Sequence, residues 1–240
     1  MYSQVIVLFA AFCSSITILA LVLGIRKNPG SKSLILFGSS LFVLAVTYSL
    51  SLIRAPSSDN LYLMIFHLCV LLACTALFCF SVEYSQPRVW LSSVYIPVLS
   101  LFPALILILL WFLASQGVSG FDPPVGDIEP ILELFTNIFS VTVLLLATLI
   151  LAQMSLSTSL SYRFQYGLPI IGNLFPIIGA SLDIFGIKEV FGVRLALTAL
   201  SITGMFLSYA LIKYNLLRIL PISRTDIVEV LKDGWLFIDR

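Results

Sequence analysis

Long apolar runs alternate with short polar breaks along the whole chain. We count seven runs of about 20 residues, near residues 4–25, 33–53, 61–82, 90–114, 130–153, 167–187 and 190–213. A helix of this length, at about 1.5 Å per residue, crosses the roughly 30 Å of bilayer hydrocarbon. Backbone groups in hydrocarbon must be paired internally, and strands of about ten alternating residues are absent. The pattern therefore predicts an all-α membrane protein, a bundle of seven transmembrane helices.

Composition supports the same class of protein. Hydrophobic residues make up 60% of the 240 residues and charged residues only 10%, and the mean hydropathy is +1.09. Soluble domains contain about one quarter charged residues. So much apolar surface cannot be hidden in one core, so we expect the bilayer to be the solvent for most of the chain.

The distribution of Lys and Arg predicts the orientation, because basic residues near helix ends are retained in the cytoplasm. With the N-terminus outside, three of the 13 basic residues, Arg54, Lys188 and Arg194, lie on the outer side. The other ten then fall on the inner side. We expect a retained first helix, an outside N-terminus and a cytoplasmic C-terminus.

The last 20 residues, PISRTDIVEVLKDGWLFIDR, have a different character. Pro221 ends the seventh helix, and Ser223 with Asp226 has the form of a capping box before a short helix. The apolar run from Trp235 to Ile238 then has the pattern of a strand, and a lone strand is not stable. We expect residues 1–220 to form the transmembrane domain and residues 221–240 to be a cytoplasmic connector with the first strand of a further domain.

Three stretches carry a family resemblance: FCFSVEYSQPR, YRFQYGLPIIGNLFP, and KYNLLRILPISRTDIVEVLKDGWLFIDR, which begins at Lys213. They resemble the N-terminal seven-helix region of histidine kinases, although GVRLALT departs from the family pattern at the start of the last helix. The resemblance implies a receptor module in a prokaryotic cell membrane. It also implies homodimerisation and a cytoplasmic output domain of PAS-like, kinase or cyclase type.

No catalytic centre is visible in the sequence. The single histidine, His67, lies inside the third apolar run, and no P-loop, GxGxxG or HExxH spacing occurs. We expect no catalytic residue, metal site, cofactor or nucleic-acid partner within these residues. The resemblance implies that any kinase activity belongs to a parent protein.

Five polar residues inside the apolar runs are candidates for a ligand site, since such groups are unfavourable in hydrocarbon unless paired or functional. These are His67, Glu133, Asn137, Asp183 and Arg194. All five are expected in the outer half of the bilayer. One hypothesis is an outward-opening cavity among the third, fifth, sixth and seventh helices that binds a small ligand or senses the outer leaflet.

The alternative is structural. Asp183 and Arg194 would form an ion pair, and His67 would hydrogen-bond a neighbouring helix. Glu133 would be favourable merely because it lies near a helix N-terminus.

Signal output is expected at the inner side, where Glu83 and Tyr84 lie at the end of the third helix, and where Lys213, Tyr214 and Pro221 lie at the end of the seventh. Glu83 and Tyr84 could form a latch or serve as interfacial anchors. A stand-alone small-molecule transporter is the alternative function, although no convincing internal repeat is present.

Overall fold

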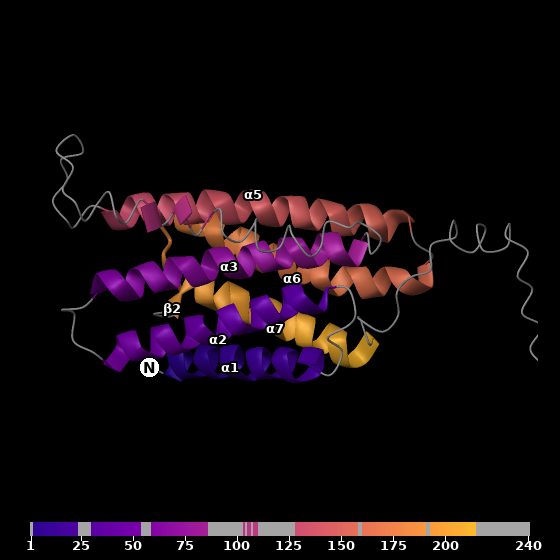
Figure 1. Ribbon diagram of the computed structural model, residues 1–240, viewed down its shortest axis with the longest axis horizontal. Helices are drawn as coiled ribbons and strands as arrows, with labels where there is room; N and C mark the ends of the chain where they lie inside the picture. The colour runs from indigo at the N-terminus through magenta and orange to yellow at the C-terminus, as the bar shows by residue number, and fades with distance from the viewer. Residues whose placement is uncertain are drawn as a thin grey trace, which may run out of the picture.

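The computed structural model describes six helices and one small strand pair (Figure 1). The described residues are 2–23, 30–53, 59–85, 128–157, 160–190 and 193–214, together with 103, 105, 106, 108 and 109. The helices are α1 (Tyr2–Leu23), α2 (Ser31–Ile53), α3 (Asp59–Ser85), α5 (Ile128–Ser157), α6 (Leu160–Ile184) and α7 (Leu195–Tyr214). All six are long and apolar enough to cross a bilayer.

The predicted helical membrane class is confirmed by these helices. Only five residues of the fourth predicted run are described, and these five are helical. The count of seven helices and the orientation therefore stay predictions. The predicted connector and strand over 221–240 lie outside the described residues.

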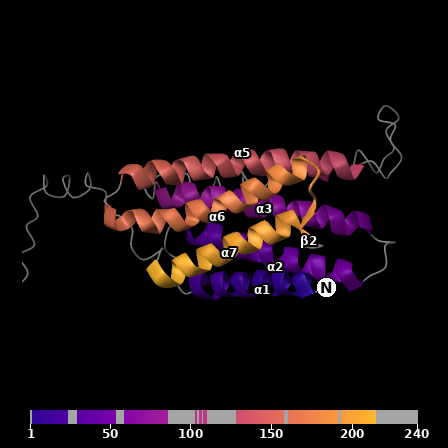
Figure 2. The same cartoon turned by 180° about the vertical axis from the view of Figure 1, so that it is seen from behind.

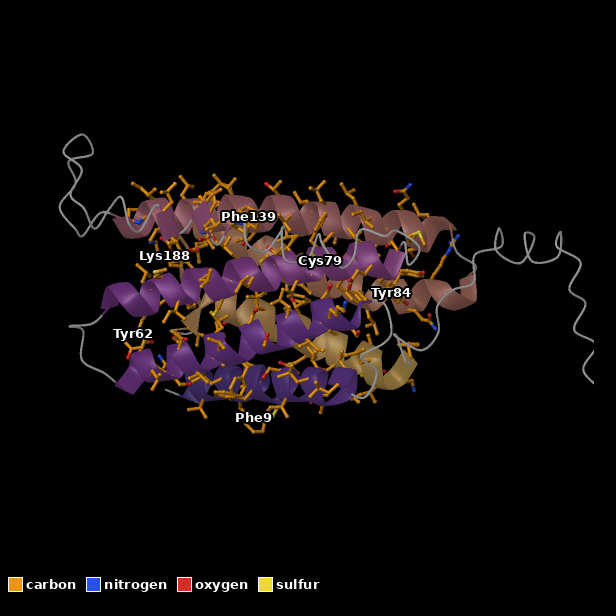
Figure 3. All side chains as sticks on the ribbon, viewed as in Figure 1. Phe9, Tyr62, Cys79, Tyr84, Phe139 and Lys188 are labelled. Carbon is orange, nitrogen blue, oxygen red and sulfur yellow. The ribbon has the colours of Figure 1, made fainter. Side chains whose placement is uncertain are left out.

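The six helices close into a ring. Each helix packs on two neighbours in the order α1, α2, α3, α5, α6, α7, and α7 packs back on α1. Figure 2 shows α7 running obliquely between α6 and α1. Some side chains point out of the ring and others into it: Phe9 projects outward from α1, whereas Tyr84 is buried (Figure 3). The ring thus places an apolar surface toward lipid on the outside of the bundle.

Two predicted helix boundaries were wrong. The sixth run was expected over 167–187, but α6 begins at Leu160, because a helix continues through polar interfacial residues that hydropathy counts as a break. The seventh run was expected from residue 190, but Glu189–Val190 (β1) and Val193–Arg194 (β2) form an antiparallel pair and α7 starts at Leu195. Hydropathy alone does not distinguish a short apolar strand from the start of a helix.

The turn after α6 is set by Gly186, whose φ of 89° is in the left-handed region. The Gly186 amide donates to the Asp183 carbonyl at 2.9 Å, and the Ile187 amide donates to the Leu182 carbonyl at 3.0 Å. This pair of bonds is a Schellman motif, which satisfies the last carbonyls of the helix. The chain is thereby turned directly into β1.

We call the end of the bundle that carries β1 and β2 the hairpin end; α1, α3, α5 and α7 begin there (Figure 1). The opposite end is where α2 and α6 begin and α7 finishes. Lys32, Arg163 and Lys213 lie at the opposite end.

Helix α7 approaches its neighbours closely through small residues. A Cβ atom added to Gly204 would lie 2.8 Å from Ser14 Oγ of α1, and one added to Gly179 of α6 would lie 3.1 Å from Ala199 Cβ. Small residues allow such close backbone approach in membrane bundles. The Ser208 hydroxyl lies 2.7 Å from the Gly204 carbonyl of its own helix and 3.3 Å from the Ser14 carbonyl of α1.

Many hydroxyl side chains donate to a carbonyl one turn earlier in their own helix. Thr75 Oγ1 donates to the Leu71 carbonyl at 2.8 Å, and Ser201 Oγ donates to the Leu197 carbonyl at 2.6 Å. Serine and threonine can make this bond without any other helix. These polar residues are therefore compatible with an apolar surrounding.

A proline inside α6 is compensated by α7. Pro176 has no N–H, so it leaves the carbonyl four residues earlier, that of Gly172, without its helical donor. The Thr203 hydroxyl of α7 lies 2.8 Å from this carbonyl and 3.0 Å from the Ala199 carbonyl of its own helix. A side chain of α7 thus satisfies a backbone group that the α6 proline frees.

Thr203→Val is expected to lower the free energy of unfolding by roughly 1 kcal/mol, because the Gly172 carbonyl then lacks its donor. Reversible unfolding in mixed detergent micelles measures this change. Thr203→Ser keeps the hydroxyl and should retain most of the stability. No loss in Thr203→Val together with a clear loss in Thr203→Ser would mean that the methyl packing of Thr203 matters and the hydrogen bond does not.

Candidate functional site

All five predicted ligand residues line one cavity of about 200 Å³ at the hairpin end. The cavity lies among α3, α5, the end of α6, the hairpin and the start of α7. Its walls are Phe66, His67, Val70, Glu133, Thr136, Asn137, Asp183, Lys188, Glu189, Arg194, Leu195 and Ala196. The structure thus brings together residues that are more than 120 positions apart in sequence.

Helix α5 contributes three polar residues from one face. Glu133, Thr136 and Asn137 have the spacing i, i+3 and i+4, so their side chains point the same way. Thr136 and Asn137 are buried, whereas Glu133 is half-buried nearer the start of the helix. The helix therefore provides both the wall and part of the rim of the cavity.

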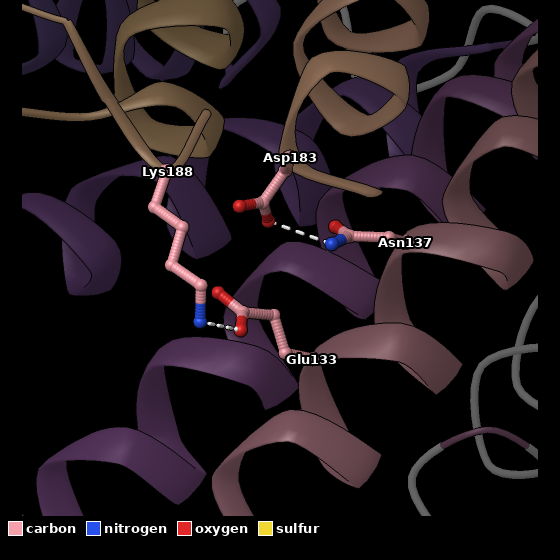
Figure 4. A network of polar contacts seen from close by, with 4 residues as sticks. All are labelled: Glu133, Asn137, Asp183 and Lys188. Atoms are coloured by element: carbon pink, nitrogen blue, oxygen red, sulfur yellow. Dashed lines mark hydrogen bonds and ion pairs between the residues drawn. The ribbon is translucent and has the colours of Figure 1, made fainter. Parts of the chain in front are cut away.

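Asn137 is bonded to Asp183 (Figure 4). Asn137 Nδ2 lies 2.6 Å from Asp183 Oδ2, which joins α5 to the last turn of α6. Asp183 Oδ1 has no hydrogen-bond partner among the described residues. One oxygen of this carboxylate is therefore satisfied and the other is left available.

Lys188 and Glu133 form an ion pair at the rim of the cavity (Figure 4). Lys188 follows the turn after α6, and 53% of its side chain is exposed, against 14% for Glu133. An ion pair this exposed contributes about 1 kcal/mol or less. Its main effect is to hold the chain after α6 against α5.

Arg194 ends β2, with its guanidinium carbon 4.9 Å from the centroid of the Phe66 ring of α3. This is a cation–π contact. The predicted alternative of an Asp183–Arg194 ion pair is wrong: Asp183 accepts from Asn137, and the Lys188–Glu133 pair is the ion pair seen in the described part of the chain. Geometry explains the difference, since β1 and β2 carry Arg194 beyond the end of α6 toward α3.

His67 is only 3% exposed, and neither ring nitrogen has a hydrogen-bond partner among the described residues. The alternative that His67 bonds a neighbouring helix is therefore wrong. Its ring lies edge-on to Phe66, with centroids 5.7 Å apart and planes at 88°. The Thr136 hydroxyl, also in the cavity wall, is likewise unpaired in the described part.

The arrangement of these side chains is suited to hydrogen bonding with a small molecule. Three elements present unpaired polar atoms: the His67 ring nitrogens, Thr136 Oγ1 and Asp183 Oδ1. The described residues contain no group of three or more His, Cys, Asp or Glu side chains suited to a metal ion. Buried polar atoms normally have partners, so those in this wall are suited to a bound molecule.

The predicted output residues lie at the opposite end. Glu83 Oε2 accepts from the Ser33 hydroxyl at 2.7 Å, and the Gly30 backbone amide also bonds this carboxylate. A carboxylate of α3 thus caps the start of α2, where a negative charge is favourable. Tyr84 is buried between Phe80 and Tyr166, with ring centroids at 5.4 Å and 5.1 Å.

The remaining output candidates are not brought together with Glu83. Lys213 is exposed and Tyr214 half-buried at the end of α7. Pro221 lies outside the described residues. Among the described residues, the side chain that donates to Glu83 is Ser33, and the charge of Lys32 also acts on this carboxylate.

Sequence reasoning missed several residues of these sites. Thr136 is next to Asn137 on the same helical face, so the spacing from Glu133 could have identified it. Phe66 and Lys188 gave no such signal, since an aromatic residue and a turn lysine are ordinary at these positions. Ser33 could be connected with Glu83 only by the packing of α2 on α3.

Asn137→Asp is expected to destabilise the bundle by about 1–3 kcal/mol, because it replaces the donor to Asp183 with a second carboxylate. The double variant N137D/D183N exchanges donor and acceptor and should recover most of this loss. Unfolding in mixed micelles tests both. If the double variant were no more stable than N137D alone, the hydrogen bond would not join these helices. Lys188→Ala is the rim control, with a cost below about 1 kcal/mol.

A family model described as the N-terminal 7TM region of histidine kinase matches residues 6–221. The match covers most of the 240 residues and confirms the resemblance found in the sequence motifs. With the six apolar helices, it identifies a multi-pass membrane protein. No curated protein and no solved structure matches the chain.

Proposed function

Because the chain belongs to the family of N-terminal 7TM regions of histidine kinases, we propose that it is the sensor module of a membrane signalling protein. In this proposal the cavity at the hairpin end receives the stimulus, and α7 passes the response to a cytoplasmic output domain. The observation that carries the proposal is the convergence of His67, Thr136 and Asp183, with unpaired polar atoms, on one cavity. Intramembrane polar groups of this kind are unfavourable unless they serve a function.

Helix α7 is the route by which the cavity would act at a distance. Arg194 lines the cavity and is followed at once by Leu195, the first residue of α7. The 20 residues of α7 span about 30 Å. Contacts of Thr203 with α6 and of Ser208 with α1 link α7 to both neighbours on the way.

A ligand shifts such a bundle only if it binds two arrangements with different affinity. In the proposal, the arrangements differ in how α7 sits between α6 and α1. Glu83 and Tyr84, with Lys213 and Tyr214 at the end of α7 and Pro221 later in the chain, belong to the output side. The bond between Ser33 and Glu83 ties α2 to α3 on that side.

The proposal includes an outside hairpin end, a cytoplasmic C-terminus and a prokaryotic cell membrane. Residues 221–240 would connect to a kinase, PAS-like or cyclase domain, and the protein would act as a homodimer, with the bilayer and a small ligand as its other partners. The basic residues Lys32, Arg163 and Lys213 at the opposite end support this orientation. Nothing among the described residues favours the transporter.

A fusion of the chain to the catalytic part of a histidine kinase tests the function. Asp183→Asn and Thr203→Val should each change autophosphorylation in membranes by about fivefold or more, because coupling between two arrangements is usually 1–3 kcal/mol. Leu149→Ala is the control, since Leu149 is 64% exposed on α5 and touches neither the cavity nor α7's contacts. Unchanged output in both test variants, together with substrate uptake into vesicles, would replace the sensor with a transporter.

The orientation has a separate test in whole cells. In a Cys13→Ser background, Lys188→Cys should react with a membrane-impermeant maleimide added outside, because Lys188 lies exposed at the hairpin end. Lys213→Cys, exposed at the opposite end, should react only after the cells are opened. The reverse pattern would place the N-terminus in the cytoplasm.

A further inference from the structure

The charges of the described residues that line the cavity are not balanced. Lys188 and Arg194 contribute two positive charges, and Glu133, Asp183 and Glu189 contribute three negative charges. With His67 neutral, two minus three gives a net charge of −1. A bound monocation would neutralise the wall, whereas a bound anion would add to the imbalance.

The unbalanced charge is located on Asp183. Lys188 is paired with Glu133, and Glu189 lies directly across the strand pair from Arg194. Residues opposite one another in an antiparallel pair are close enough for their charges to interact. Asp183 has only the neutral donor Asn137 on one oxygen, and no cation pairs with it among the described residues.

The unpaired atoms match one kind of donor. Asp183 Oδ1 accepts hydrogen bonds, the Thr136 hydroxyl can accept one, and a neutral His67 ring has one accepting nitrogen. A primary ammonium group carries three N–H donors and one positive charge. The cavity wall therefore offers three acceptors and one uncompensated carboxylate to such a group.

The rest of the cavity limits the size of the ligand. Its volume of about 200 Å³ lies below the roughly 300–1,000 Å³ of pockets for drug-sized molecules. Val70, Leu195 and Ala196 provide apolar wall beside the polar atoms. A short carbon chain fits beside these residues, and a large ring system does not.

We propose that this cavity binds a small primary amine, with its ammonium group at Asp183, Thr136 and His67 and its carbon chain against the apolar wall. The inference rests on the proposed function in one respect, since it names the ligand class of the sensor's input. The binding itself requires no output domain.

Binding is tested with the 240-residue chain in phosphatidylcholine nanodiscs, which carry no net lipid charge to attract amines. The probes are propylammonium, 1-propanol and propionate, which share a carbon chain and differ in the terminal group. Saturation-transfer NMR titrations should show saturable binding of propylammonium and weaker or no binding of the other two. Because this comparison uses the unaltered chain, it does not depend on any variant folding.

Two variants locate the ammonium group. Asp183→Asn should weaken propylammonium binding about tenfold or more, the usual effect of removing a charged hydrogen-bond partner. Leu149→Ala, on the exposed face of α5 and outside the cavity, should leave the affinity unchanged. Propionate binding as well as propylammonium, no saturable amine binding, or equal affinity in Asp183→Asn would each overturn the proposal.

The same probe in the kinase fusion separates the ligand class from the sensor function. Amine binding with no change in autophosphorylation would support the inference and contradict the proposed function. Output that changes in Asp183→Asn without any amine binding would support the function and contradict the ligand class.

Discussion

The constraint on which this structure depends is the absence of water in hydrocarbon, which obliges polar groups to find partners within the protein. The backbone meets it through helices, and many hydroxyl side chains meet it through carbonyls of their own helix, as Thr75 does. Where Pro176 breaks the helical pattern, Thr203 of α7 supplies the missing donor. Glu83 meets the same demand by capping α2 through Ser33.

Some buried polar groups remain without a partner among the described residues, and three of them lie together. His67, Thr136 and Asp183 lie within one cavity and retain unpaired polar atoms, although each comes from a different helix. A structural role would have been served by pairing them with one another or by replacing them with apolar residues. Other buried atoms, such as Gln165 Oε1, also lack a partner among the described residues, but these three groups line one cavity, which is the reason why we propose the hairpin end as the input.

Much of this organisation could be predicted from the sequence because it depends on depth in the bilayer. The apolar runs predict the helices. The positions of His67, Asn137 and Asp183 within those runs predict that the three side chains lie at a similar depth in the bilayer. Lateral contacts could not be predicted, because hydropathy contains no information about which helices are neighbours. The Asp183–Arg194 pair was therefore expected from proximity in sequence, whereas the partner of Asp183 comes from α5. The strand pair was missed because two strands of two residues each are too short to give a periodic signal.

The hydroxyl bonds within single helices also bear on how the protein is made. Thr75 and Ser201 are satisfied before any neighbour arrives, so α3 and α7 can enter the bilayer one at a time with these groups already paired. Thr203 can serve the Gly172 carbonyl only after α6 and α7 have met, and Asn137 reaches Asp183 only after α5 and α6 have met. Insertion and assembly are thus separate stages of biogenesis, and the cavity with its polar wall comes into existence only at the second.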